Sequence, residues 1–345
     1  MHRALVLASI LVIAACGKRT APNVSEKSAK LSGDDALKDP SAKPQGYTDI
    51  YLHDVQLQEA GGITLNVRWL SGRMYQTQKG VVASLDNPQS FTLDIQDGAV
   101  AVKLAEVAKL LNTRVLNGSP VSDVKLEAQG NQIKLTGMLH KLVPLPIQVL
   151  IDTGVSPDGQ QIALRIAKLD VLKIPVGGLL KFFDVKPVDL IDPQKTNGIT
   201  IRGNDIVLDT AQLLPPPRNT GKLSAVHVSP QGELVEVYGS PRGEIKKIEQ
   251  WRNFIRLRGG ITRIGKLTMQ PTDILLVDTS QDDWFTFDLT QLPEQLVSGY
   301  ARLTPQAGLQ MFIPDIGKIP ATKANEQINV EWIKNRNVAP PADIP

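Results

Sequence analysis

The sequence predicts an α+β fold, in which a mainly antiparallel sheet is accompanied by two or three helices. Apolar residues recur at every second position in many short segments, and turn-forming sequences separate these segments. Helical spacing of apolar residues is rare by comparison. Aliphatic residues dominate the 42% hydrophobic content, whereas aromatic residues make up 5%. We therefore expect Val, Ile and Leu to line the interior.

The clearest hairpin is predicted around segment 156–159, whose sequence is Ser-Pro-Asp-Gly. Proline presets the first dihedral angle of a turn, and glycine accepts the left-handed conformation that follows. Similar sequences occur at 229–232 and 304–308, and shorter ones at 130–131 and 203–205. The strands on either side of the first turn are marked by alternating apolar residues: Ile147, Val149 and Ile151, then Ile162, Leu164 and Ile166.

Helices are predicted at 104–115, 175–185 and 292–300. The first has an apolar stripe and ends at Asn117-Gly118, which is typical of a helix terminus. The second starts with Pro175 and is apolar nearly all round. Such a helix is more commonly packed in a core than part of a ligand groove, and the pattern alone does not separate the two.

Residues 1–15 have the layout of a secretory signal peptide, because Arg3 precedes a short apolar run. That run is shorter than the roughly 20 residues of a transmembrane helix. Ile13-Ala14-Ala15-Cys16 resembles the lipobox of bacterial lipoproteins, in which the signal is cut before the cysteine and the thiol receives a diacylglyceryl group. Cys16 is the only cysteine, so we predict that it is the lipid attachment site. The alternative is a plain signal with an incidental cysteine.

The rest of the chain divides by composition. Segment 16–46 is rich in Lys, Ser, Asp and Pro, and we expect a flexible tether. We expect an α+β domain over 47–240, a β-rich C-terminal extension over 241–320 and a tail over 321–345. Removal of the signal takes away only one of 38 basic residues, against 35 acidic ones. This near balance does not favour nucleic-acid binding.

Sequence motifs for catalysis are missing. The histidines after the signal, His53, His140 and His227, are far apart and have no hydrolase or zinc motif around them. Segment 260–267 matches P-loop spacing, but Leu267 stands where Ser or Thr must hold magnesium. We therefore expect a protein that is not an enzyme and has no cofactor or metal.

A basic cluster lies at 256–266 and comprises Arg256, Arg258, Arg263 and Lys266. Arg256 and Arg258 are two residues apart, so they share one face of a predicted strand. Guanidinium groups suit phosphate, including the phosphate of lipid headgroups. A solvated strand face is the commoner explanation for such charges.

The order of these features resembles the LmeA-like phospholipid-binding family and, more remotely, tubular lipid-binding proteins, over about residues 84–239. The leucine-rich helix 104–112, the Leu-Leu-Pro-Pro segment 213–216 and the glycine-turned strand after it carry the resemblance. It implies a strongly curved antiparallel sheet wrapped around one or two helices, with an apolar groove for acyl chains. The lipobox, the tether and the residues after Gly239 lie outside the resemblance.

From the lipobox we expect a membrane-tethered envelope lipoprotein, and from the LmeA-like resemblance we expect that it binds or transfers phospholipid, or a similar amphiphile, without catalysis. The residue after the cysteine, Gly17, is not the aspartate that resembles an inner-membrane retention signal, which favours the outer membrane and a periplasmic location. The expected groove residues are Leu104, Leu111, Leu179, Leu180, Phe182 and Phe183, and the expected headgroup contacts are Arg256, Arg258 and Arg263.

Two other functions remain open. The first is a structural or assembly module of the cell envelope, whose sheet edges pair with partner proteins. The second is a hydrolase of envelope lipid or glycan, which a cluster of His140 or His227 with a carboxylate would favour.

Overall fold

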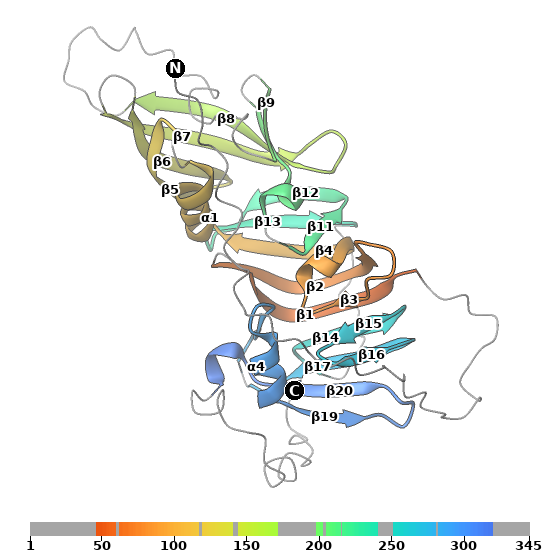
Figure 1. Cartoon of the computed structure of the whole chain (residues 1–345). Coiled ribbons are helices and arrows are strands. Elements are labelled where there is room, and N and C mark those ends of the chain that lie inside the picture. Colours follow the sequence, from red (N-terminus) through yellow and green to blue (C-terminus); the bar gives the residue numbers. More distant parts are fainter. Residues whose placement is uncertain are drawn as a thin grey trace, which may run out of the picture. The chain divides into compact units, whose positions relative to one another are not determined.

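The structure is dominated by β-sheet and has only a few short helices, which confirms the sheet-rich character of the predicted fold (Figure 1). It is a computed structural model that describes residues 46–59, 62–116, 119–140, 144–171, 198–202, 205–214, 216–240, 251–280 and 282–319. The predicted signal peptide, Cys16, nearly all of the tether, the helix at 175–185 and the tail lie outside the described residues.

The largest sheet has eleven strands. They are β1 (Thr48–Glu59), β2 (Ile63–Gln76), β4 (Phe91–Lys103), β11 (Arg218–Gly221), β12 (Leu223–Val228), β13 (Glu233–Tyr238), β14 (Phe254–Gly259), β17 (Thr272–Asp278), β18 (Phe285–Asp288), β19 (Tyr300–Leu303) and β20 (Leu309–Ile313). Their order is β12-β13-β4-β2-β1-β14-β17-β20-β19, with β11 paired to β4 and β18 to β1. Figure 1 shows the colours passing from orange to blue across β1 and β14.

The C-terminal segment continues this sheet, because β14 pairs with β1 in antiparallel register and places Ile255 opposite Leu52. The sheet is mixed. The pairs β1–β18, β4–β11 and β17–β20 are parallel, although the sequence predicted only antiparallel hairpins. Parallel partners come together after long connections, so local turn sequences do not reveal them.

A second sheet has six strands, all paired in antiparallel fashion. They are β5 (Val121–Gln129), β6 (Gln132–His140), β7 (Pro144–Val155), β8 (Ile162–Val171), β9 (Ile199–Arg202) and β10 (Asp205–Leu208), in the order β5-β6-β7-β8-β10-β9. A third, small sheet has the order β16-β15-β3 and contains β3 (Ala83–Ser84), β15 (Thr262–Ile264) and β16 (Leu267–Met269).

The predicted hairpins are confirmed. The turn at 156–159 joins β7 to β8, the turn at 229–232 joins β12 to β13, and the turn at 304–308 joins β19 to β20. Gly159 and Gly232 have φ values of 73° and 77°, the left-handed conformation expected of them. The rejected P-loop segment forms the β15–β16 hairpin instead of leading into a helix.

Two of the three predicted helices lie in the described residues and are confirmed. Helix α1 (Leu104–Leu110) continues as one π-helical turn (Leu111–Val115), and α4 (Leu292–Ser298) begins near the expected residue. The four-residue helix α3 (Thr210–Leu213) was not predicted, because it is too short to show an apolar stripe. None of the described helices has the length and apolar character needed to cross a bilayer.

One apolar core joins the two large sheets. Strand β12 packs against β7, and the Thr153 hydroxyl donates to the carbonyl of Val226 at 3.3 Å. A smaller cluster of Phe254, Leu275, Val277 and Phe312 is separate from this core. Because β17 supplies side chains alternately to both clusters, it is buried on both faces and its sequence reads as a continuous apolar run.

Candidate functional site

Aliphatic side chains cover one face of the six-stranded sheet. The hairpin registers place Leu126 opposite Leu135, Leu135 opposite Val149, and Val149 opposite Leu169. Residues directly opposite each other in antiparallel strands point to the same side, so these rows form a continuous surface. We name it the aliphatic face, and its members are Leu126, Ala128, Ile133, Leu135, Val149, Ile151, Ile162, Leu164, Ile166, Leu169, Ile206 and Leu208.

The opposite face of the same sheet is polar. Lys134 pairs with Glu127 at 2.7 Å and Arg165 pairs with Asp205 at 2.8 Å. The hydrogen bond from Lys134 lowers the pKa of Glu127, and the one from Arg165 lowers the pKa of Asp205. The sheet therefore has one wet face and one aliphatic face.

A hollow of about 540 Å³ lies beside the β7–β8 hairpin, and Asp152, Arg165 and Asp205 are among the residues that line it. Asp152 accepts a hydrogen bond from Gln132 at 2.7 Å, while the other two are paired with each other. This hollow is on the wet face, and its charged lining does not suit an acyl chain.

The described helices and strands cover only part of the aliphatic face. Among the described helices and strands, α1 with its π-helical turn and β12 pack closely on this sheet, and they contact β5, β6 and β7. On β8 and β10, the side chains of Leu164, Ile166, Leu169 and Leu208 are half-buried. Further burial of such surface is favourable by about 25 cal/mol per Å². This half of the face can therefore gain free energy by binding an apolar ligand.

Two of the six expected groove residues lie among the described residues, and both are on or next to α1. Leu104 is 1% exposed and belongs to the main core, so it is not accessible to a ligand in this structure. Leu111 is half-buried and packs against the same core. Leu179, Leu180, Phe182 and Phe183 lie outside the described residues.

The three expected headgroup arginines are not brought together as one site. Arg256 is 8% exposed and its guanidinium pairs with Asp273, so it is held in the fold by a carboxylate rather than presented to a phosphate. Arg258 is exposed and lies between Asp49 and Asp273 on the neighbouring strands. Arg263 is exposed on β15, in the small sheet.

His140 does come close to a serine and a carboxylate. Its Nε2 lies 2.9 Å from Ser122 Oγ, and the Ser122 hydroxyl donates to Asp123 Oδ2 at 2.8 Å. A hydroxyl has one hydrogen. When Ser122 donates to Asp123, the tautomer that fits is the one in which Nε2 carries a proton and donates to Ser122. A histidine in that tautomer is not a base for the serine.

The other two histidines show no such arrangement. His227 is exposed on β12. His53 lies 3.1 Å from Asp54 and stacks on Phe254 with ring centroids 5.7 Å apart. His53 therefore packs against Phe254, a member of the smaller apolar cluster.

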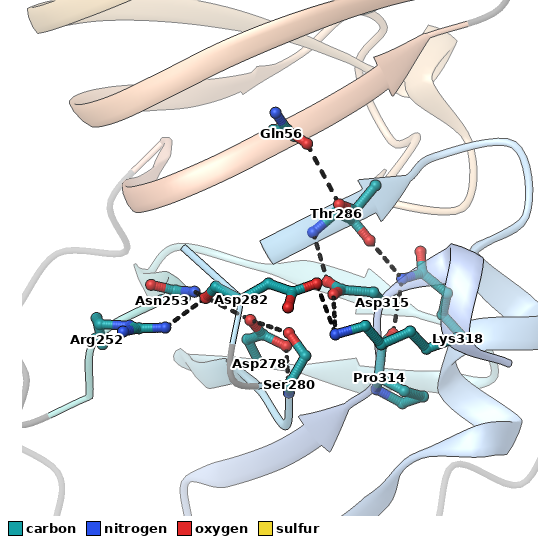
Figure 2. A network of polar contacts seen from close by, with 11 residues as sticks. Gln56, Arg252, Asn253, Asp278, Ser280, Asp282, Thr286, Pro314, Asp315 and Lys318 are labelled. Carbon is teal, nitrogen blue, oxygen red and sulfur yellow. Dashed lines mark hydrogen bonds and ion pairs between the residues drawn. The ribbon is translucent and has the colours of Figure 1, made fainter. Parts of the chain in front are cut away.

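A buried polar network ties the C-terminal strands together (Figure 2). Asp278 accepts hydrogen bonds from the Ser280 N–H at 2.7 Å, the Ser280 hydroxyl at 2.8 Å and Asn253 Nδ2 at 3.0 Å. Asp315 accepts the N–H of Thr286 at 2.7 Å and lies 3.6 Å from Lys318 Nζ. Because backbone and side-chain donors already satisfy these carboxylates, we infer that the network stabilises the fold.

The protonation of Asp278 is nevertheless unusual. Burial raises its pKa to about 6, with a smaller contribution from the nearby Asp315, and the hydrogen bonds from Ser280 and Asn253 oppose the shift. Within the described residues, no group of three or more His, Cys, Asp or Glu side chains could hold a metal ion.

Comparison with protein-family models, curated proteins and solved structures finds no match for this chain. The alternation of Leu164 and Ile166 predicted a strand, whereas the expected groove residues were on helices. The sequence shows the alternation of these residues, but it does not show which face of the strand other elements cover.

Proposed function

We propose that this chain is an envelope lipoprotein, attached to a membrane through lipidated Cys16, that binds the acyl chains of a phospholipid or similar amphiphile on the aliphatic face. It sequesters or transfers the lipid and breaks no bond. The proposal includes the curved sheet with its apolar groove that the LmeA-like resemblance implies. The periplasmic face of the outer membrane is the proposed location.

The single observation that carries the proposal is the half-buried aliphatic surface of β8 and β10. Half-buried Leu and Ile side chains gain free energy from further burial, and acyl chains contribute about 0.8 kcal/mol per buried methylene. A chain of ten methylenes on this surface therefore gains about 8 kcal/mol before the cost of ordering is subtracted. The opposite face of the same sheet carries ion pairs and therefore favours contact with water.

The direct test is native mass spectrometry of the chain from Cys16 onward, carrying Cys16→Ser so that no attached lipid is mistaken for a bound one. The protein is purified without detergent and then extracted with solvent. Phospholipid-sized adducts in a fixed ratio support the proposal. A bare polypeptide mass that stays bare after incubation with phosphatidylglycerol and phosphatidylethanolamine vesicles contradicts it.

A matched pair of variants locates the lipid. Ile166 is half-buried on the aliphatic face, while its neighbour Ala167 is exposed. Ile166→Asp places a charge where the acyl chain lies, and retention should fall at least tenfold. Ala167→Asp adds the same charge outside the face and should leave retention unchanged. Equal retention in two folded variants would exclude this face as the binding site.

A second candidate is the structural envelope module, and one observation favours it. Strand β19 is at the end of the order of the eleven-stranded sheet, and its Leu303 is 72% exposed. Edge strands that carry exposed apolar residues can pair with another chain. Cross-linking from position 303 in cells to a partner protein, together with a lipid-free native mass, would favour this function over lipid binding.

A further inference from the structure

A small cavity lies against the eleven-stranded sheet, and none of its lining residues belongs to the aliphatic face. Its volume is about 40 Å³. Most of its lining is aliphatic and comes from Leu52, Leu57, Leu65, Val67, Leu70, Leu93, Ile95, Val100, Leu214 and Leu289. Leu57, Val100 and Leu214 are half-buried, unlike most of the other aliphatic lining residues.

Polar side chains are built into this apolar lining. Glu236 and Tyr238 alternate with outward residues on β13, and they are 9% and 5% exposed. The Tyr238 hydroxyl donates to Glu236 Oε2 at 2.6 Å. Asn219, on β11, also lines the cavity, and its buried Oδ1 has no hydrogen-bond partner among the described residues. Two kinds of acceptor oxygen therefore meet in one apolar cavity.

This combination needs a hydrogen-bond donor. Tyr238 has already given its single hydrogen to Glu236, so it has none left for Asn219. A buried acceptor without a partner is destabilising, and a donor in the cavity removes that cost. Burial raises the pKa of Glu236, and the hydrogen bond from Tyr238 opposes the shift. A neutral donor suits such surroundings better than an ammonium group, whose transfer from water is costly.

The volume limits what can enter. One water-sized group takes about 10–15 Å³ of a cavity, so about three such groups fit. A terminal hydroxymethyl group is of this size, while a phosphate headgroup is not. The apolar chain behind it would leave past Leu57, Val100 and Leu214.

We propose that this cavity is a second ligand site, which receives the hydroxyl end of an uncharged single-chain amphiphile and hydrogen-bonds it to Glu236 and Asn219. The site goes beyond the proposed phospholipid function, because none of its residues belongs to the aliphatic face. It also reverses the usual arrangement of an amphiphile at a protein surface, since the polar end is inside.

Isothermal titration of the chain from Cys16 onward, carrying Cys16→Ser, with 1-decanol tests the proposal. We expect 1:1 binding that is at least tenfold tighter than that of decane or decylamine. Glu236→Leu should weaken decanol binding at least tenfold. Glu233→Gln is the matched control, because Glu233 is on the same strand but accepts a hydrogen bond from Asn66 and does not line the cavity. The Glu233→Gln variant should bind decanol with the same affinity as the unmodified protein.

If Glu236→Leu does not fold, Asn219→Leu tests the same cavity from β11. Equal affinity for decanol and decane, or unchanged decanol affinity in a folded Glu236→Leu or Asn219→Leu variant, would overturn the proposal. Ile166→Asp separates the two sites. Loss of phospholipid with decanol binding intact supports two sites, whereas loss of decanol binding in Ile166→Asp places decanol on the aliphatic face and overturns the cavity site. If phospholipid binding fails, the decanol measurement still tests whether the cavity is a ligand site.

Discussion

The side-chain amide of Asn112 makes two hydrogen bonds to the backbone of Val124. Asn112 Nδ2 donates to the Val124 carbonyl at 2.7 Å, and the Val124 N–H donates to Asn112 Oδ1 at 2.9 Å. Val124 lies in a bulge of β5, where the register against β6 shifts between Ser122 and Lys125. The amide supplies partners that the bulge removes from the ladder, and it fixes the π-helical turn to an edge of the six-stranded sheet.

Asn112→Ala should therefore destabilise the protein by about 1–3 kcal/mol, because it leaves two backbone groups of Val124 without partners. Urea denaturation followed by circular dichroism measures this loss. Thr113→Ala is the control, since Thr113 is exposed and bonds only carbonyls of its own helix. A change below about 0.5 kcal/mol in Asn112→Ala would mean that water replaces the amide.

The ion pair between buried Arg256 and half-buried Asp273 predicts unequal effects of two neighbouring arginines. Arg256→Met should cost about 2–3 kcal/mol of unfolding free energy, because the Asp273 carboxylate loses its partner. Arg258→Met, on the same face of β14 but exposed, should change it by less than about 0.5 kcal/mol. If lipid retention falls in Arg258→Met while its stability is unchanged, a headgroup role for Arg258 would be restored.

Asp278 predicts a pH dependence of stability with a defined sign. Its pKa is about 6 in the folded protein, against an ordinary value of 3.8. Between these values the folded state binds more protons than the unfolded state, so the unfolding free energy contributed by Asp278 falls as pH rises from about 4 to about 6. Above that range the contribution is constant.

Asp278→Asn should remove this slope. Urea midpoints of both proteins at pH 4.5 and pH 7.5 test it, and the unmodified protein should lose more stability than the variant between these pH values. Asp315, Asp282 and Lys318 are also charged in this region and are present in both proteins. Parallel pH profiles for the two proteins would show that Asp278 is ionised in the fold at both pH values.

Ser122 should not react with a fluorophosphonate probe, because its hydroxyl donates to Asp123 and His140 is then not a base for it. Gel fluorescence or peptide mass spectrometry reads the labelling, and a known serine hydrolase in the same sample serves as the positive control. Stoichiometric labelling that disappears in Ser122→Ala would restore the hydrolase function.

Cys16 should carry the membrane anchor. Cys16→Ser should move the protein from the membrane fraction to the soluble fraction and abolish incorporation of labelled palmitate, because several acyl chains are needed for stable attachment. The unmodified chain, expressed in parallel in a diderm bacterium, is the control. A Cys16→Ser variant that stays in the membrane fraction would require another means of attachment.

The sequence by itself determined the local elements. The Pro-Gly turns at 156–159 and 229–232 specified hairpins, because a turn fixes the dihedral angles at which a chain reverses. The apolar spacing in 104–115 specified a helix. In each case the decisive interactions are between residues a few positions apart, so a single sequence contains them.

Only the tertiary structure decided the pairing of distant segments. Strand β1 lies between β2 and β14, and the sequence carries no local mark of its pairing with β14. The same holds for burial. Leu104 was expected in a groove and is in the core, and Arg256 was expected at a headgroup and is paired with Asp273.

The aliphatic face shows the limit most clearly. Alternation predicted that Leu164 and Ile166 share a side of β8, because side chains on a strand point alternately to its two faces. Whether that side meets a core or a ligand depends on which elements pack on it, and β12 covers β7 but does not pack closely on β8. That choice depends on residues far apart in the chain, and only the assembled sheets determine it.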